Sequence, residues 1–180
     1  MSQTFTKITT GPVVSTPGDS RSVNWIDMNN DGLVDLFISN GKAGGQNNML
    51  YMNLGNGSFL ARTGDPIVSD NKPSDGATFA DSDNDGDADS YVVNWYNFDN
   101  LYYINDGIAN FTEIQGTAVV NTNGYCETAS WGDYDNDGYP DLAVCGRDNY
   151  NNYHLLILKN ERGRLRKICD FIDETPSPAV

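Results

Sequence analysis

Short apolar runs alternate with glycine- and asparagine-rich turns along the chain. In its first third, the apolar runs fall at residues 22–26, 33–39, 48–53 and 59–63. β-Branched and aromatic residues dominate these runs, as is typical of strands, and no stretch has the 3.6-residue period of an amphipathic helix. The pattern therefore predicts an all-β protein.

The pattern of runs repeats about every 50 residues. An aromatic residue stands two residues before each copy of an acidic loop, and a phenylalanine stands 22 residues before it. The first set is Trp25, Phe79 and Trp131, and the second is Phe5, Phe59 and Phe111. This period indicates a solenoid, propeller or array, and four short antiparallel strands per repeat describe one blade of a β-propeller. We expect the recurring aromatic residues to pack between blades.

The repeats define the expected organisation of the chain. We predict one repeat domain over residues 1–180, with repeats at 5–58, 59–110 and 111–164 and with 165–180 as a partial fourth repeat or a tail. The predicted fold is a β-propeller with three four-stranded blades per chain.

Each repeat contains one nine-residue acidic loop, at residues 27–35, 81–89 and 133–141. Positions 1, 3, 5 and 9 carry carboxylate or amide oxygens, position 6 is glycine, and position 7 offers its backbone carbonyl. Such oxygen ligands, with a glycine for the sharp turn, suit a hard cation, calcium before magnesium. The sequence thus predicts three Ca²⁺ ions per chain. The predicted ligands are Asp27, Asn29, Asp31, Leu33 and Asp35, then Asp81, Asp83, Asp85, Asp87 and Asp89, then Asp133, Asp135, Asp137, Tyr139 and Asp141.

These loops differ from the helical EF-hand loop. An EF-hand carries a bidentate glutamate at position 12, where this chain has Ile38, Val92 and Val144. Strand-like sequence follows each loop, and Pro140 within the third loop disfavours a helix there. We therefore expect each loop to join two strands.

Together these features resemble the VCBS / FG-GAP repeat family, the calcium-binding blades also seen in the integrin α-subunit propeller and in some fungal lectins. The resemblance rests on the Asp-x-Asp-x-Asp-Gly-x-x-Asp loop, the aromatic residue before it and the run at residues 50–59, and it extends from Phe5 to about Ile168. It implies a Ca²⁺ ion in each hairpin loop. Because Asn29 replaces an aspartate, the first site carries one charge fewer, and we expect it to bind more weakly.

Three blades do not close a ring, since known propellers use about four to eight. Residues 165–168 repeat the pattern of residues 5–8 and 111–114, so both ends of the chain offer the same strand. Two chains pairing head to tail, each completing the other's blades with a terminal strand, would make a six-bladed ring. The alternatives are an excerpt of a larger propeller and a gene fragment. Open blade faces leave apolar surface and unpaired edges in water, and we expect the homodimer.

The charge balance excludes one class of partner. With 25 acidic and 11 basic residues the net charge is −14, and no basic stripe is available for nucleic acid. The chain shows no transmembrane run and no signal peptide, so we expect no membrane insertion. Calcium modules of moderate affinity load most reliably at the millimolar concentrations outside cells, which favours an extracellular or cell-surface location.

The three cysteines, Cys126, Cys145 and Cys169, follow no repeat logic, so we expect free thiols. Cys126 and Cys145 flank the third loop on strands that we expect to pair.

The residues favour a binding module over an enzyme. The single histidine, His154, lies on a predicted strand, the clustered carboxylates belong to the loops, and no nucleophile stands in a recognisable motif. Loops that vary between repeats carry function on repeated scaffolds. These loops bring Trp95, Tyr96 and Tyr150 beside asparagine and aspartate, which suits a glycan platform. Ordinary interblade packing by these rings, a protein partner and a purely structural module remain the alternatives.

Overall fold

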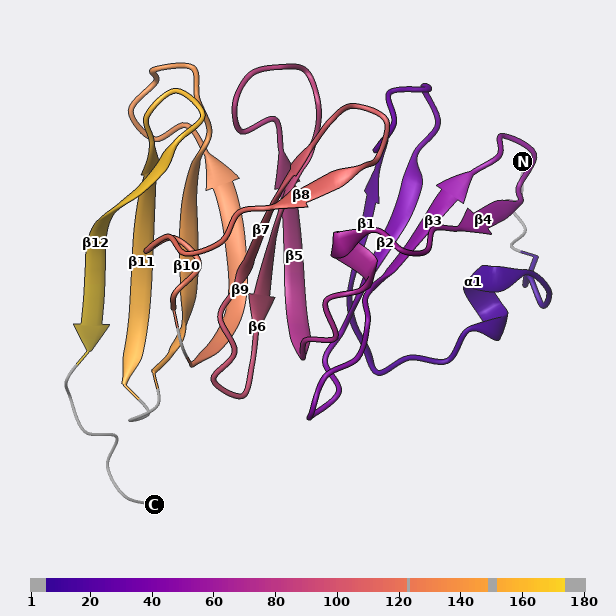
Figure 1. The fold of residues 1–180 in the computed structure, drawn as a ribbon, viewed down its shortest axis with the longest axis horizontal. Helices are drawn as coiled ribbons and strands as arrows, with labels where there is room; N and C mark the ends of the chain where they lie inside the picture. The colour runs from indigo at the N-terminus through magenta and orange to yellow at the C-terminus, as the bar shows by residue number, and fades with distance from the viewer. Residues whose placement is uncertain (1–5, 123, 149–151, 174–180) are drawn as a thin grey trace, which may run out of the picture.

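The computed structural model describes residues 6–122, 124–148 and 152–173. Over these residues it contains three four-stranded antiparallel sheets, which stand side by side in an open row (Figure 1). The first sheet consists of β1 (Ser20–Ile26), β2 (Asp35–Asn40), β3 (Met49–Asn53) and β4 (Phe59–Ala61). The second consists of β5 (Ser74–Ala80), β6 (Asp89–Asn94), β7 (Leu101–Asn105) and β8 (Phe111–Glu113). The third consists of β9 (Tyr125–Gly132), β10 (Asp141–Arg147), β11 (Tyr153–Asn160) and β12 (Leu165–Asp173).

The all-β prediction is confirmed, and the blade-like sheets follow the predicted runs closely. Each of the four runs predicted in the first repeat corresponds to one strand of the first sheet, with ends that agree within two residues. In every sheet the strands are arranged in chain order, so each strand pairs with its neighbour through a hairpin. The three blade-like sheets of the described residues form an open row and do not close a ring.

The sheets are offset by one strand from the repeats of the sequence. Phe59, which opens a repeat in the sequence, begins β4, the last strand of the first sheet. By the same logic Leu165 begins β12, which pairs along β11 and is the fourth strand of the third sheet. The third sheet is thus completed by its own chain, and the strand that we expected to complete a blade of a partner is already paired.

Two short helical segments depart from the expectation of strands and turns alone. α1 (Pro12–Ser15) and the 3₁₀ turn η1 (Pro66–Val68) occupy equivalent positions before the first and second sheets. Each has a proline at its start, where the fixed φ angle favours a helical turn and the missing N–H is not needed. η1 buries Ile67 and Val68.

The apolar cores lie between the sheets, at two places that we call seams. At the first seam, between the first and second sheets, Phe37 and Leu50 pack against Val92 and Tyr103. At the second seam, Tyr91 and Tyr102 pack against the third sheet. The branched pairs Ile67–Val68 and Val119–Val120 belong to these two cores, respectively. Among the three sheets, only the second has a neighbouring sheet on each side, and it therefore buries both of its faces.

Two of the three recurring aromatic residues pack across the seams, as predicted. The Phe79 ring lies edge-on to Phe37 of the first sheet, with centroids 5.4 Å apart. The Trp131 ring lies 6.3 Å from Tyr102 of the second sheet. Trp25, at the same position of the first sheet, instead contacts Phe59 of its own sheet and is 58% exposed. Trp25 differs because the described residues contain no sheet before the first one.

Asp70 is an ionisable side chain at the first seam. Its Oδ2 atom accepts hydrogen bonds from Asn48 Nδ2 at 3.0 Å and from the Tyr103 hydroxyl at 3.4 Å. Burial raises the pKa of Asp70 to about 7 and outweighs the backbone hydrogen bond from Lys72. This carboxyl therefore takes up a proton when the chain folds between pH ~4 and ~7.

The raised pKa predicts how Asp70→Asn changes stability with pH. Because the folded state binds the extra proton, Asp70 makes the wild type less stable as pH rises through this window. We expect the variant to melt a few degrees above the wild type at pH 8 and to show no gain at pH 4, measured by thermal unfolding at both pH values. The same shift at both pH values would contradict the assignment.

Candidate metal centres

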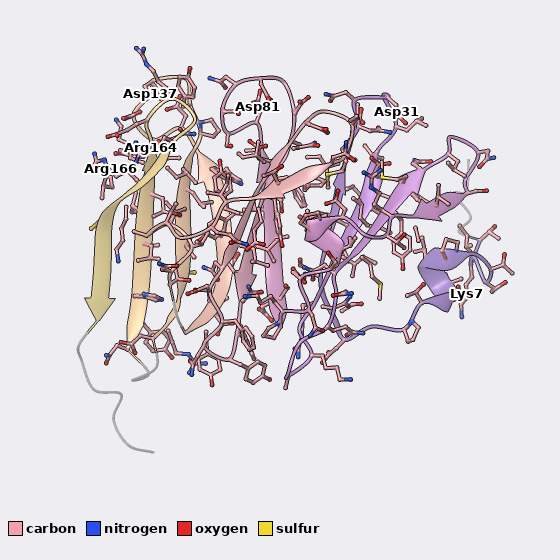
Figure 2. The ribbon with its side chains drawn as sticks, viewed as in Figure 1. Lys7, Asp31, Asp81, Asp137, Arg164 and Arg166 are labelled. Carbon is pink, nitrogen blue, oxygen red and sulfur yellow. The ribbon has the colours of Figure 1, made fainter. Side chains whose placement is uncertain are left out.

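The three acidic loops lie in a row along one edge of the sheets. Figure 2 labels one residue from each, Asp31, Asp81 and Asp137, along its upper edge. All three loops have the same backbone, with left-handed residues at positions 4 and 6. These are Asn30, Asn84 and Asn136 (φ 56°, 63° and 60°) and Gly32, Gly86 and Gly138 (φ 85°, 97° and 91°). Asparagine and glycine tolerate this conformation best, which explains the residue types at these positions.

Side-chain acceptors within each loop fix its shape. In the first loop, Asp27 accepts from the N–H groups of Asp31 at 3.2 Å and Gly32 at 2.8 Å. Asp31 in turn accepts from the N–H of Leu33 at 2.8 Å. The same bonds recur at Asp81 and Asp85 in the second loop and at Asp133 and Asp137 in the third, with distances of 2.9 to 3.1 Å. The loop is therefore shaped by its own hydrogen bonds, with aspartates as turn formers.

The aspartate at position 9 fastens each loop to its sheet. Asp35 is fully buried and accepts from the N–H groups of Met28 at 3.0 Å and of Asn53, the last residue of β3, at 2.7 Å. Asp89 and Asp141 make the equivalent pairs of bonds. Burial raises the pKa of Asp35, and it raises the pKa of Asp89 to about 6. In Asp35 and Asp141 each carboxylate oxygen keeps one further lone pair for a cation, whereas Asp89 Oδ2 also accepts from the Ser82 hydroxyl.

The strand-ending asparagine also joins neighbouring sheets. Asn105 Nδ2 donates to the Met28 carbonyl of the preceding sheet at 2.9 Å. Asn160 Nδ2 donates in the same way to the Ser82 carbonyl at 2.6 Å. In this arrangement the backbone N–H of the asparagine donates to the aspartate at position 9, and its side-chain amide donates to the loop of the preceding sheet. We call it the asparagine clamp. Nothing in the sequence beyond the recurrence of Asn53, Asn105 and Asn160 signals it.

Three of the five predicted ligands converge in each of the second and third loops. Single carboxylate oxygens of Asp81, Asp83 and Asp85 all lie within 4.8 Å of one another, and so do those of a third-loop group. That group comprises Asp133, Asp135 and Asp141. In the first loop Asn29 stands at position 3, and its Nδ2 donates to Asp31 at 3.0 Å. At position 7, the N–H groups of Leu33, Asp87 and Tyr139 bond to position 5, and the role of their carbonyls as ligands stays a prediction.

The second loop provides a physical test of whether a cation fits. Asp83 Oδ1 is buried and has no hydrogen-bond partner among the described residues. Burial raises the pKa of Asp83, and the negative charge of Asp85 raises it further. A buried carboxylate oxygen without a donor is unfavourable unless a cation lies beside it. The all-oxygen donor set and this orphaned atom both fit a hard divalent cation.

A lysine side chain from β11 reaches the carboxylates of the third loop. The Lys159 ammonium forms an ion pair with Asp135 and lies 3.9 Å from Asp137. The hydrogen bond from Lys159 lowers the pKa of Asp135 and raises that of the lysine. Met52 and Ile104 occupy this position in the first two sheets, so a lysine before the strand-ending asparagine was the sequence signal that we missed.

Adjacent loops are also linked to one another. The side chain of Asn30 donates to Asp87 of the second loop, and Asn84 Nδ2 donates to the Gly138 carbonyl of the third loop at 2.9 Å. The asparagine at position 4 therefore has two roles, in the turn and in the contact with the next loop.

The predicted glycan platform lies at the opposite end of the sheets, because β6 begins at the acidic loop and ends just before Trp95 (Figure 1). Trp95 and Tyr96 pack edge-on with centroids 5.9 Å apart, and both lie within 6.0 Å of Tyr125. The Arg21 guanidinium lies 5.7 Å from the Trp95 ring. Tyr150 lies outside the described residues. Sequence reasoning missed Tyr125 and Arg21, because they come from other sheets.

The described part of the chain holds Cys126, Cys145 and Cys169 as free thiols. Cys126 pairs opposite Gly146, next to Cys145, and is buried while Cys145 is half-buried. No helix among the described residues is long and apolar enough to cross a membrane.

Three blade-like sheets, each with one acidic loop on a shared edge, define a β-propeller-like repeat module. A family model described as FG-GAP-like repeat matches residues 27–92, which include the first two acidic loops. This match confirms the resemblance: residues 27–92 are similar to the FG-GAP-like repeat, which is consistent with an FG-GAP/VCBS-like repeat family. No curated protein matches the chain.

Proposed function

We propose that this protein is a calcium-stabilised recognition module without catalytic activity. FG-GAP repeats generally bind calcium, and acidic clusters stand where this chain would hold it. The observation that carries the proposal is Asp83 Oδ1, a buried carboxylate oxygen without a donor inside a loop whose other bonds are satisfied. One Ca²⁺ per loop would be held by the side-chain oxygens of positions 1, 3, 5 and 9 and the backbone carbonyl of position 7, with the amide oxygen of Asn29 at position 3 of the first loop.

Calcium would act by removing repulsion between carboxylates that the folded chain holds together. A ligand that binds the folded state alone stabilises it by RT ln(1 + [L]/Kd), about 2.7 kcal/mol per site at a hundredfold excess over Kd. The millimolar calcium outside cells supports an extracellular or cell-surface setting for such a module. His154, the only histidine, is buried on β11, which supports a non-enzymatic role.

Asp83→Asn tests the structural role of calcium, because its effect on the melting temperature should differ in sign between calcium and chelator. The substitution keeps the shape of the side chain and removes its charge, so it weakens calcium binding and relieves repulsion when calcium is absent. We expect a lower melting temperature than the wild type in millimolar calcium, and an equal or higher one in chelator, both measured by thermal unfolding.

Asp99→Asn is the matched control. Asp99 also has a buried oxygen without a hydrogen-bond partner, but it lies outside the acidic loops. Its variant should shift the melting temperature equally with calcium and with chelator. The proposal is wrong if Asp83→Asn also shifts it equally in the two conditions.

The three sites should differ in affinity, because the Lys159 ammonium competes for the third loop and Asn29 removes a charge from the first. We expect Lys159→Met, which installs the residue of the first sheet, to raise the affinity of one site severalfold in isothermal titration with calcium. Lys72→Met is the control, since that ammonium lies over the Phe98 ring. An unchanged affinity in Lys159→Met would contradict the competition.

For recognition, we propose that the cluster of Trp95, Tyr96 and Tyr125 binds carbohydrate. Tyr96 is 37% exposed, and Asn97 and Asp99 follow it closely in the sequence. Flat apolar rings suit the faces of sugars, and amide groups suit their hydroxyls. The second candidate is a purely structural role, which is favoured by the half-buried position of Trp95 and its edge-on contacts.

Tyr96→Asn separates these two roles. Tyr96 has a φ of 55°, which asparagine tolerates better than tyrosine, so the variant loses the ring without added backbone strain. On a glycan array, we expect binding by the wild type and loss of that binding in the variant, with an unchanged melting temperature. If the melting temperature falls and the wild type binds no glycan, the rings are structural.

A further inference from the structure

The outward faces of the first and third sheets are exposed at positions that the seams bury. Ala77 and Phe79 of the second sheet, and their equivalents Ala129 and Trp131 in the third, pack against the cores. The same positions of the first sheet, Val23 and Trp25, are 59% and 58% exposed. The second and third sheets each use this surface to pack against the sheet before them. In the first sheet the same surface is exposed.

The third sheet presents the complementary surface. Position 2 of the acidic loop is Met28 in the first sheet and Ser82 in the second, both almost fully buried by the following sheet. In the third sheet this position is Tyr134, which is 55% exposed. The described sheets thus leave exposed the two complementary halves of one interface, which occurs twice between them.

A groove on the third sheet marks where the missing aromatic residue would fit. The groove has a volume of about 480 Å³ and is lined by residues of the third sheet and its acidic loop, Ala143 and Ile157 among them. In the second sheet the equivalent cross-strand pair is Tyr91 and Tyr102, which packs at the second seam with Trp131. Smaller side chains at Ala143 and Ile157 leave room there for an indole ring.

The asparagine clamp is also unmatched at both ends. Asn53 Nδ2 donates to the Val34 carbonyl of its own sheet at 2.9 Å, as Asn160 does to Pro140. Asn160 donates in addition to position 2 of the preceding loop, and the first sheet has no preceding loop among the described residues. The corresponding acceptor left over at the other end is the Tyr134 carbonyl.

The charged residues on the first strands of the three sheets also favour a first sheet that follows a third sheet. Arg21, Asp75 and Glu127 occupy one position on β1, β5 and β9. Asp75 lies between the opposite charge of Arg21 and the like charge of Glu127. A first sheet that follows a third sheet would bring Arg21 beside Glu127, where opposite charges attract.

From this continuity, we propose that a second copy of this chain covers both open faces, head to tail. Trp25 of each protomer would enter the groove of the other, and Asn53 would donate to the carbonyl of Tyr134 of the partner subunit. Two chains would then place six sheets in one ring, within the range of about four to eight blades that closed propellers use. The two new contacts are related by a twofold axis, so the assembly is closed and stops at two chains.

Sedimentation equilibrium of the full chain in millimolar calcium tests the proposal. We expect a particle of twice 19.8 kDa. Trp25→Glu should give a monomer with unchanged far-UV circular dichroism. Ala143→Trp, which fills the groove from the other side, should also give a monomer. Ile108→Glu is the control and should remain dimeric, because Ile108 is 64% exposed on the turn after β7, away from both open faces.

Three results would overturn the proposal. A wild-type monomer at every concentration would mean that another occupant, such as further blades of a longer chain, covers the faces. A growing series of masses would mean that the contact does not close. Dimers that persist in both Trp25→Glu and Ala143→Trp would mean that another surface pairs. Each result is independent of calcium stabilisation, which the melting temperatures in calcium and in chelator report separately.

Discussion

The buried aspartate at the end of each acidic loop is the constraint on which the other features depend. Asp35, Asp89 and Asp141 are at most 3% exposed, and each holds two backbone N–H groups, one from its own loop and one from the end of the third strand. A carboxylate in this position fixes the distance between the loop and the sheet. The asparagine that supplies the second N–H also donates to the loop of the preceding sheet, at Asn105 and Asn160. Loop geometry, strand pairing and sheet packing are therefore parts of one hydrogen-bonded unit, and a change at a metal ligand should be felt at a seam.

Much of the fold could be predicted because it repeats in the sequence. The period of about 50 residues, the alternation of apolar positions and the glycine at position 6 are local signals, and they give the strands, the hairpins and the acidic loops. The packing of Phe79 and Trp131 followed from their recurrence. The exposure of Trp25 could not be predicted in this way. Trp25 and Trp131 are the same residue type at equivalent positions, and only the presence of a preceding sheet decides which of them is covered.

The candidate sites were predictable to different degrees for the same reason. Ligands within one nonapeptide are set by local spacing, so the clusters at Asp81–Asp83–Asp85 and in the third loop could be anticipated. Lys159 reaches the third loop from β11, and Arg21 reaches Trp95 from the first sheet. Such contacts depend on strand register and on the face that a side chain occupies, and one residue of register decides both. To predict such contacts, one needs to know how neighbouring sheets are placed relative to each other, and the spacing of residues in the sequence does not give this.

Each sheet is built from one uninterrupted stretch of chain, since β4, β8 and β12 complete their own hairpins. In an assembly of such sheets, no strand is exchanged at the junction between chains. Two finished protomers would meet as rigid bodies, by diffusion and docking, without the partial unfolding that domain swapping requires. Their association would then be fast and concentration-dependent, and protomers would separate without melting.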